Sequence, residues 1–184
     1  MKTFKYLIRL LFVFAALANL TFAEDTAKEI DHDANGALSV FYSEVNGGKK
    51  YLEKAAGYVV FPDVKEAGMF FGGKYGEGAL RVDGKTKGYY SITSASIGMQ
   101  MGAQKYSLII ALTTPKALKK FMRDDDWDTD MDFNIAIADW NNDEELDDID
   151  FGTDMVGFVF DAKGMMGNFT FEGTRFERIH PDLE

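Results

Sequence analysis

Small residues interrupt the apolar stretch at residues 84–106, and this pattern constrains the fold more than any other feature of the chain. The stretch reads GKTKGYYSITSASIGMQMGAQKY, which is rich in strand-forming residues and too apolar for a linker. Gly98 and Gly102 are four residues apart, so they share one face of a strand. The same spacing separates Gly68 and Gly72. Missing side chains let a neighbouring element approach closely or a sheet bend sharply. The pattern predicts a tightly coiled small barrel, and a groove for an acyl chain or a partner is the alternative.

The first 23 residues have the pattern of a secretory signal peptide. Three basic residues precede an apolar run at 10–18, and Thr21-Phe22-Ala23 fits a cleavage site. The run is shorter than the ~20 apolar residues that a spanning helix needs, although a retained anchor is the alternative. The chain has no cysteine, so no lipid-carrying thiol follows the cleavage site. We therefore expect residues 1–23 to be removed and the mature protein to be periplasmic or secreted.

Helical periodicity comes first in the mature chain and β patterns follow. Residues 24–56 form the expected helical segment, interrupted at Gly47-Gly48, and residues 57–180 form the expected β domain. Asp83-Gly84 is a strong hairpin turn signal, and Thr114-Pro115 opens a helix near residues 115–122. The predicted strands are 58–61, 67–75, 78–82, 88–94, 96–104, 106–112, 131–138, 155–161 and 166–179. These elements predict a mainly β (α+β) fold, a single antiparallel barrel- or sandwich-like domain.

Acidic residues concentrate in one part of a chain whose net charge is −10. Residues 123–150 hold 13 acidic residues and one basic residue, whereas the rest of the mature chain is almost neutral. No basic surplus exists to release the counterions of phosphate backbones, so nucleic-acid binding is not expected.

Alternating aspartates within this acidic part resemble the start of a calcium loop. Asp126, Asp128 and Asp130 have the spacing, but Met131 replaces the turn glycine and Ile137 replaces the closing glutamate. Alternate residues of a strand lie ~6.6 Å apart, so these carboxylates line a face rather than surround one ion. A solvated strand face is the expected structure, and weak divalent-cation binding, helped by the following acidic loop, is the alternative.

The sequence contains no pattern of a catalytic triad or thiol nucleophile, and a pair of carboxylates for glycoside chemistry is the alternative that its 30 acidic residues leave open. Neither of the two histidines, His32 and His180, lies near a serine or acid pattern that indicates a triad. Without cysteine, no thiol nucleophile or cysteine zinc site can form. We therefore expect a protein that is not an enzyme and that uses no cofactor.

Four stretches and the closing RI at 178–179 together resemble the SYLF domain family in order and spacing. The four stretches are GYVVFP (57–62), AGMFFGGKYGEG (67–78), GYYSITSASIGMQMGAQKYSLII (88–110) and GFVFDAKGMMGNFTFEGT (157–174). The resemblance implies a lipid-binding module. Eukaryotic members bind phosphatidylinositol phosphates and some yeast members bind actin filaments, whereas exported bacterial members are described generically as lipid-binding. In the family, lipid binding is linked to a basic amphipathic N-terminal segment, but here residues 24–56 carry seven acids and four bases.

Lysines and one arginine are the candidates for contact with anionic headgroups, and each favourably placed residue contributes about 1 kcal/mol to binding. The predicted lipid-binding residues are Lys49, Lys50, Lys54, Arg81, Lys85 and Lys87. A second basic group lies on the helix that begins at Pro115. The leading hypothesis is a non-catalytic module that binds lipid or a membrane surface in the bacterial envelope or secreted space. The alternatives are a protein-interaction or structural protein of the envelope and a weak divalent-cation binder.

Overall fold

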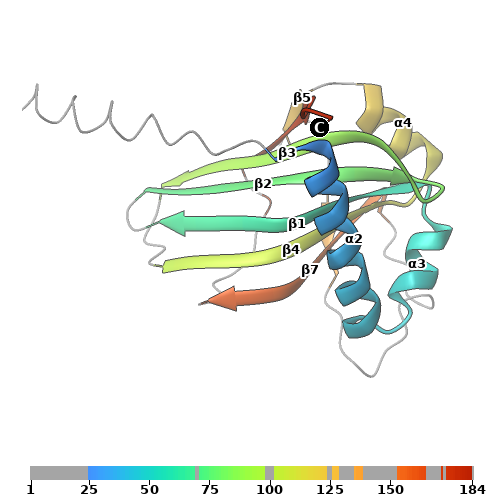
Figure 1. The fold of residues 1–184 in the computed structure, drawn as a ribbon, viewed down its shortest axis with the longest axis horizontal. Coiled ribbons are helices and arrows are strands. Elements are labelled where there is room, and N and C mark those ends of the chain that lie inside the picture. The colour runs from blue at the N-terminus through green and yellow to red at the C-terminus, as the bar shows by residue number, and fades with distance from the viewer. Residues whose placement is uncertain are drawn as a thin grey trace, which may run out of the picture.

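The computed structural model describes residues 25–68, 71–97, 102–123, 126–128, 135–138, 153–164, 171 and 173–183. Three helices and eight strands lie within these residues (Figure 1). The helices are α2 (Ala27–Glu44), α3 (Gly48–Lys54) and α4 (Pro115–Arg123). The strands are β1 (Gly57–Gly68), β2 (Phe71–Val82), β3 (Lys85–Ile97), β4 (Gly102–Leu112), β5 (Asp126–Asp128), β6 (Ile135–Ile137), β7 (Met155–Gly164) and β8 (Thr174–Ile179).

All eight strands belong to one curled sheet in the order β5-β8-β3-β2-β1-β4-β7-β6. The predicted mainly β (α+β) class is confirmed, as are the N-terminal helical segment and the helix near residue 115. The expectation of a purely antiparallel arrangement is wrong, because β6 pairs in parallel with β7. The long connection from β6 to β7 provides the length of chain that a parallel pair requires.

Each face of the sheet carries its own hydrophobic core. On one face α2 buries Phe41, whose ring lies 5.3 Å from those of Phe158 and Phe160. The apolar stripe of α2 therefore packs on the sheet. On the other face α4 buries Phe121 against Tyr90, with ring centroids 4.7 Å apart. The helices thus cover opposite faces of the sheet (Figure 1).

Local capping explains where the helices begin and end. Thr26 and Glu29 form a reciprocal capping box at the start of α2. The predicted interruption lies between α2 and α3, where Gly47 has a φ of 76°. The Thr114 hydroxyl accepts a hydrogen bond from the Ala117 amide at 3.1 Å, so α4 starts at the predicted place.

Pro62 does not end a strand as the sequence indicated. β1 continues through it, with shifts in its register against both neighbouring strands between Val60 and Lys65. Proline is tolerated at such a bulge because no regular ladder hydrogen bond is lost there. Gly76 and Gly78 of β2 accommodate the bulge. A Cβ atom at Gly78 would lie 2.3 Å from the Val60 carbonyl oxygen, which is closer than two such atoms can approach.

One pair of the glycines with four-residue spacing does not share one face of a single strand, although the sequence predicted that it would. Gly68 and Gly72 belong to successive strands and are cross-strand partners rather than neighbours on one face. Gly102, at the start of β4, also pairs with Gly68. Paired glycines of β2, β1 and β4 therefore lie side by side at the end of the sheet that is far from α3 (Figure 1). Gly98 lies outside the described residues.

Other strand boundaries differ from the prediction because two of the strands are longer than expected. β2 and β3 each run unbroken through the gaps that were expected near residues 76 and 95. Of the predicted strand 131–138, residues 135–137 form β6 and residues 131–134 lie outside the described part. None of the helices within the described residues is both long enough and apolar enough to cross a bilayer.

Candidate functional site

Three segments that are distant in the sequence meet at one end of the sheet. They are α3, the β2–β3 hairpin tip at residues 83–87 (the 83–84 turn and the first residues of β3, called the 83–87 turn below), and α4, and together we call them the basic end (Figure 1). A Cβ atom at Gly57 would lie 3.1 Å from Leu118 of α4 and 3.2 Å from Val82 at the end of β2. Residues of α3 and of the turn line one common cleft. The packing therefore brings two lysine groups that the sequence showed separately to the same end of the molecule.

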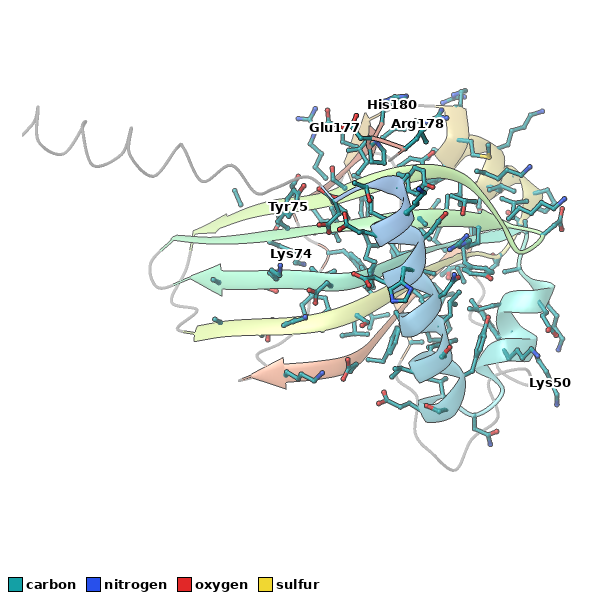
Figure 2. All side chains as sticks on the ribbon, viewed as in Figure 1. Lys50, Lys74, Tyr75, Glu177, Arg178 and His180 are labelled. Carbon is teal, nitrogen blue, oxygen red and sulfur yellow. The ribbon has the colours of Figure 1, made fainter. Side chains whose placement is uncertain are left out.

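The basic end carries far more cations than carboxylates. Its cations are Lys49, Lys50, Lys54, Lys85, Lys87, Lys116, Lys119, Lys120 and Arg123. Its three segments contain only two acidic residues, Glu53 and Asp83. All of the cations except Lys120 are exposed, and Figure 2 shows Lys50 projecting from α3. Such a density of exposed positive charge favours contact with an anionic surface.

Arg81 differs from the other predicted lipid-binding residues because its side chain is buried. Its guanidinium lies 3.1 Å from the Asp31 carboxylate and also donates to Asn35 at 3.1 Å. Asp31 accepts further hydrogen bonds from Thr86 at 2.8 Å and from Tyr89 at 3.2 Å. These contacts join α2 to the strands on either side of the turn, so Arg81 helps to position the turn.

Two large apolar side chains are exposed beside these cations. Tyr42, on the last turn of α2, and Met122, on α4, are each 38% exposed. On α4 the buried Ala117 and Phe121 face the sheet, while Lys116 and Lys119 face solvent. Tyr42 lies on the α2 side of the sheet and Met122 on the α4 side, so each lysine group of the basic end has an exposed apolar side chain of the kind that membrane contact favours.

A cleft of about 340 Å³ lies between α3 and the turn. Its walls include Tyr42, Leu52, Glu53, Tyr58 and Asp83. Burial raises the pKa of the Tyr42 hydroxyl, and its hydrogen-bonded neighbour Tyr58 and the Glu53 carboxylate raise this pKa further. The two tyrosines and the glutamate therefore lie close to one another inside the cleft.

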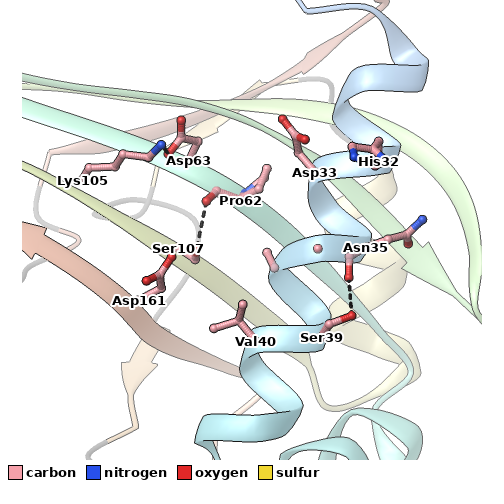
Figure 3. A pocket seen from close by; sticks show the side chains of 12 residues that line it. His32, Asp33, Asn35, Ser39, Val40, Pro62, Asp63, Lys105, Ser107 and Asp161 are labelled. Carbon is pink, nitrogen blue, oxygen red and sulfur yellow. Dashed lines mark hydrogen bonds and ion pairs between the residues drawn. The ribbon is translucent and has the colours of Figure 1, made fainter.

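A larger groove of about 510 Å³ runs between α2 and the strands β1, β4 and β7 (Figure 3). Two charged residues that line the groove form an ion pair, since the Lys105 ammonium lies 2.5 Å from the Asp63 carboxylate. The Ser107 hydroxyl donates to the Pro62 carbonyl oxygen at 2.8 Å, and the Ser39 hydroxyl donates to the Asn35 carbonyl oxygen at 3.0 Å. Lys105, Ser107 and Ser39 of this groove therefore each bind another group of the protein.

The sequence did not reveal the lysine row that borders this groove. Lys65, Lys105 and Lys163 are register partners on β1, β4 and β7, so they lie side by side across the sheet. Asp63 and Asp161 form ion pairs with them. Only the strand order could have brought these lysines together, because β1 and β7 are far apart in the sequence.

Lys74 lies on the other half of β2, away from the basic end (Figure 2). Its side chain is only 6% exposed. Burial lowers the pKa of the Lys74 ammonium, and the Glu66 carboxylate partly offsets this effect. Gln104 donates to the Glu66 carboxylate at 2.9 Å, and both side chains are partly buried.

The acidic stretch is only partly described by the structure. Asp126 and Asp128 lie in β5, opposite Glu177 and Arg175 of β8. Asp130 and residues 139–150 lie outside the described part. Among the described residues, no three histidine, aspartate or glutamate side chains gather as metal ligands would. The predicted convergence of this stretch with the acidic loop therefore stays a prediction.

Comparison with known proteins identifies a family for the second half of the chain. A family model described as Ysc84, Las17-binding protein actin regulator, matches residues 93–180. The match extends from within β3 to the end of β8 and leaves out α2, α3 and the central strands β1 and β2. No curated protein matches the chain.

Proposed function

Because the chain belongs to the SYLF (Ysc84) domain family through residues 93–180, we propose that it is a non-catalytic module that binds anionic membrane surfaces through its basic end. The convergence of α3, the 83–87 turn and α4 carries this proposal. Nine cations and two carboxylates belong to these three segments, and Tyr42 and Met122 are exposed beside them. The sequence pattern of the first 23 residues supports an envelope or secreted location for the mature chain.

The polar face of α4 provides the sharpest test. Lys116 and Lys119 are both exposed, and α4 keeps its buried face when their charges are removed. A lysine close to an anionic surface contributes about 1 kcal/mol, so losing two should weaken binding roughly thirtyfold. The double variant Lys116→Gln, Lys119→Gln should therefore lose most of its binding to anionic vesicles.

The experiment is co-sedimentation of the chain from residue 24 with phosphatidylcholine vesicles and with vesicles that contain phosphatidylglycerol, at low and high salt. A matched control is Lys65→Gln, Lys163→Gln, which removes the same charge from the sheet, away from the basic end. Binding to anionic vesicles that fades with salt and is lost only in the α4 variant supports the proposal. Absence of binding under every condition would refute it and favour a protein partner instead.

A further inference from the structure

The two carboxylates of the basic end line the same cleft, and the Glu53 carboxylate also lies 4.0 Å from the Lys49 ammonium group. Glu53 comes from α3 and Asp83 from the turn, yet both line the 340 Å³ cleft. Every other charged residue of these three segments is a cation. Two carboxylates in the walls of a cleft weaken the binding of a simple anion such as phosphate. The cleft therefore favours a cationic group, whereas the lysine-rich surface around it favours an anionic one.

Aromatic side chains provide the other walls of the cleft. Tyr42 and Tyr58 are hydrogen-bonded to each other, and the Glu53 carboxylate lies close enough to raise the pKa of Tyr42. Leu52 and Ala55 add apolar surface. Tyrosine rings and carboxylates that line one cleft are groups to which a substituted ammonium group is attracted.

Cations stand directly next to the residues that line the cleft. Lys54 follows Glu53 on α3, and Lys85 follows Gly84, which itself lines the cleft. A ligand that fits both features carries a positive group at one end and a negative group a few atoms away. We propose that the cleft binds the ammonium group of a zwitterionic phospholipid headgroup, whose phosphate then lies against the neighbouring lysines.

This inference rests on the proposed function and names the headgroup that the same end of the molecule recognises. The lysines of α4 contact the anionic surface, whereas the cleft selects a lipid that carries a substituted ammonium group. Because the two features use different side chains, each can be removed while the other is kept.

Phosphocholine is the probe that tests the cleft, with binding followed by chemical-shift changes or calorimetry on the chain from residue 24. The variant is Glu53→Gln together with Asp83→Asn, which removes both charges at almost constant size. Asp83 has a φ of 51°, and asparagine adopts that backbone conformation readily, so the turn is kept. We expect the variant to bind phosphocholine at least tenfold more weakly, and tetramethylammonium to show the same loss.

Two controls separate the cleft from general electrostatics. Glu44→Gln removes a charge from the end of α2, outside the residues that line the cleft, and should leave phosphocholine binding unchanged. Lys85→Gln should weaken phosphocholine but leave tetramethylammonium unchanged, because only the former carries a phosphate. Phosphatidylcholine vesicles should compete with free phosphocholine, and lack of competition would refute the lipid as the source of the headgroup.

The outcomes also distinguish this inference from the proposed function. The Glu53→Gln, Asp83→Asn variant should still sediment with phosphatidylglycerol vesicles, because its basic end is more positive than before. Equal phosphocholine binding by the variant and the parent chain, or no phosphocholine binding at all, would overturn the cleft assignment while leaving the anionic surface contact intact. Loss of anionic-vesicle binding in the α4 variant alone tests only the proposed function.

Discussion

Gly78 should be among the least replaceable residues of the sheet, and Gly78→Ala tests the bulge that explains it. A Cβ atom there would lie 2.3 Å from the Val60 carbonyl oxygen, 2.9 Å from the Val60 carbonyl carbon and 2.7 Å from the Phe61 ring. Two of these atoms belong to the backbone of β1, which is held on both sides by β2 and β4. The strain therefore cannot be relieved by rotating one side chain.

Overpacking of a core costs about 1–3 kcal/mol, and the involvement of backbone atoms places this substitution near 3 kcal/mol. For a chain of this size, each kcal/mol lowers the melting temperature by roughly 2–4 °C, so Gly78→Ala should melt about 6–12 °C below the parent. Thermal and urea unfolding of the chain from residue 24 provide the measurement.

Gly36→Ala is the matched control for the same added methyl group. Gly36 lies on α2, where nothing is within 4 Å of the added Cβ atom. Alanine is better than glycine in a helix by about 0.5–1 kcal/mol, so this variant should melt slightly above the parent. If Gly78→Ala melted within about 1 °C of the parent, the close approach of β1 to β2 at the bulge would be refuted.

Two further predictions concern buried charge. Arg81→Met leaves Asp31 without its cation and should lower the free energy of unfolding by about 3 kcal/mol in urea; a loss below 1 kcal/mol would contradict the anchoring role of this ion pair. The pKa of Lys74 is lower in the folded chain than its ordinary value of 10.5, so the unfolded chain binds more protons and the stability contributed by this group rises as the pH approaches 10.5. Urea unfolding between about pH 8 and 10 should show that rise, and Lys74→Met should remove it; an unchanged slope in the variant would show that another group titrates.

Local signals in the sequence were sufficient where a structure depends on neighbouring residues. Thr114 followed by Pro115 gave the start of α4, and Gly47-Gly48 gave the break between α2 and α3. Asp83-Gly84 forms the turn between β2 and β3, with a positive φ at both residues. In each case the determining interaction lies within a few residues along the chain, so its pattern can be read directly.

Features that depend on strand pairing were not predictable in the same way. Pro62 carries the usual signal for the end of a strand, but the bulge of β1 is possible only because Gly76 and Gly78 lie opposite on β2. Likewise, Arg81 is a basic residue beside a turn, and only the packing of α2 shows that Asp31 buries and neutralises it. The lysine row of β1, β4 and β7 depends on the order of strands in the sheet.

The net charge of −10 suggests at first sight a protein that anionic membranes repel. That conclusion does not hold, because exposed charges more than about 10 Å apart are largely screened at moderate salt. In the sequences of the three segments that form the basic end, nine cations stand against two carboxylates. Both of those carboxylates line one cleft, so their negative charge is confined to that part of the basic end. What a membrane encounters therefore depends on how the fold groups the charges, and the fold brings the nine cations of α3, the 83–87 turn and α4 to one end of the sheet.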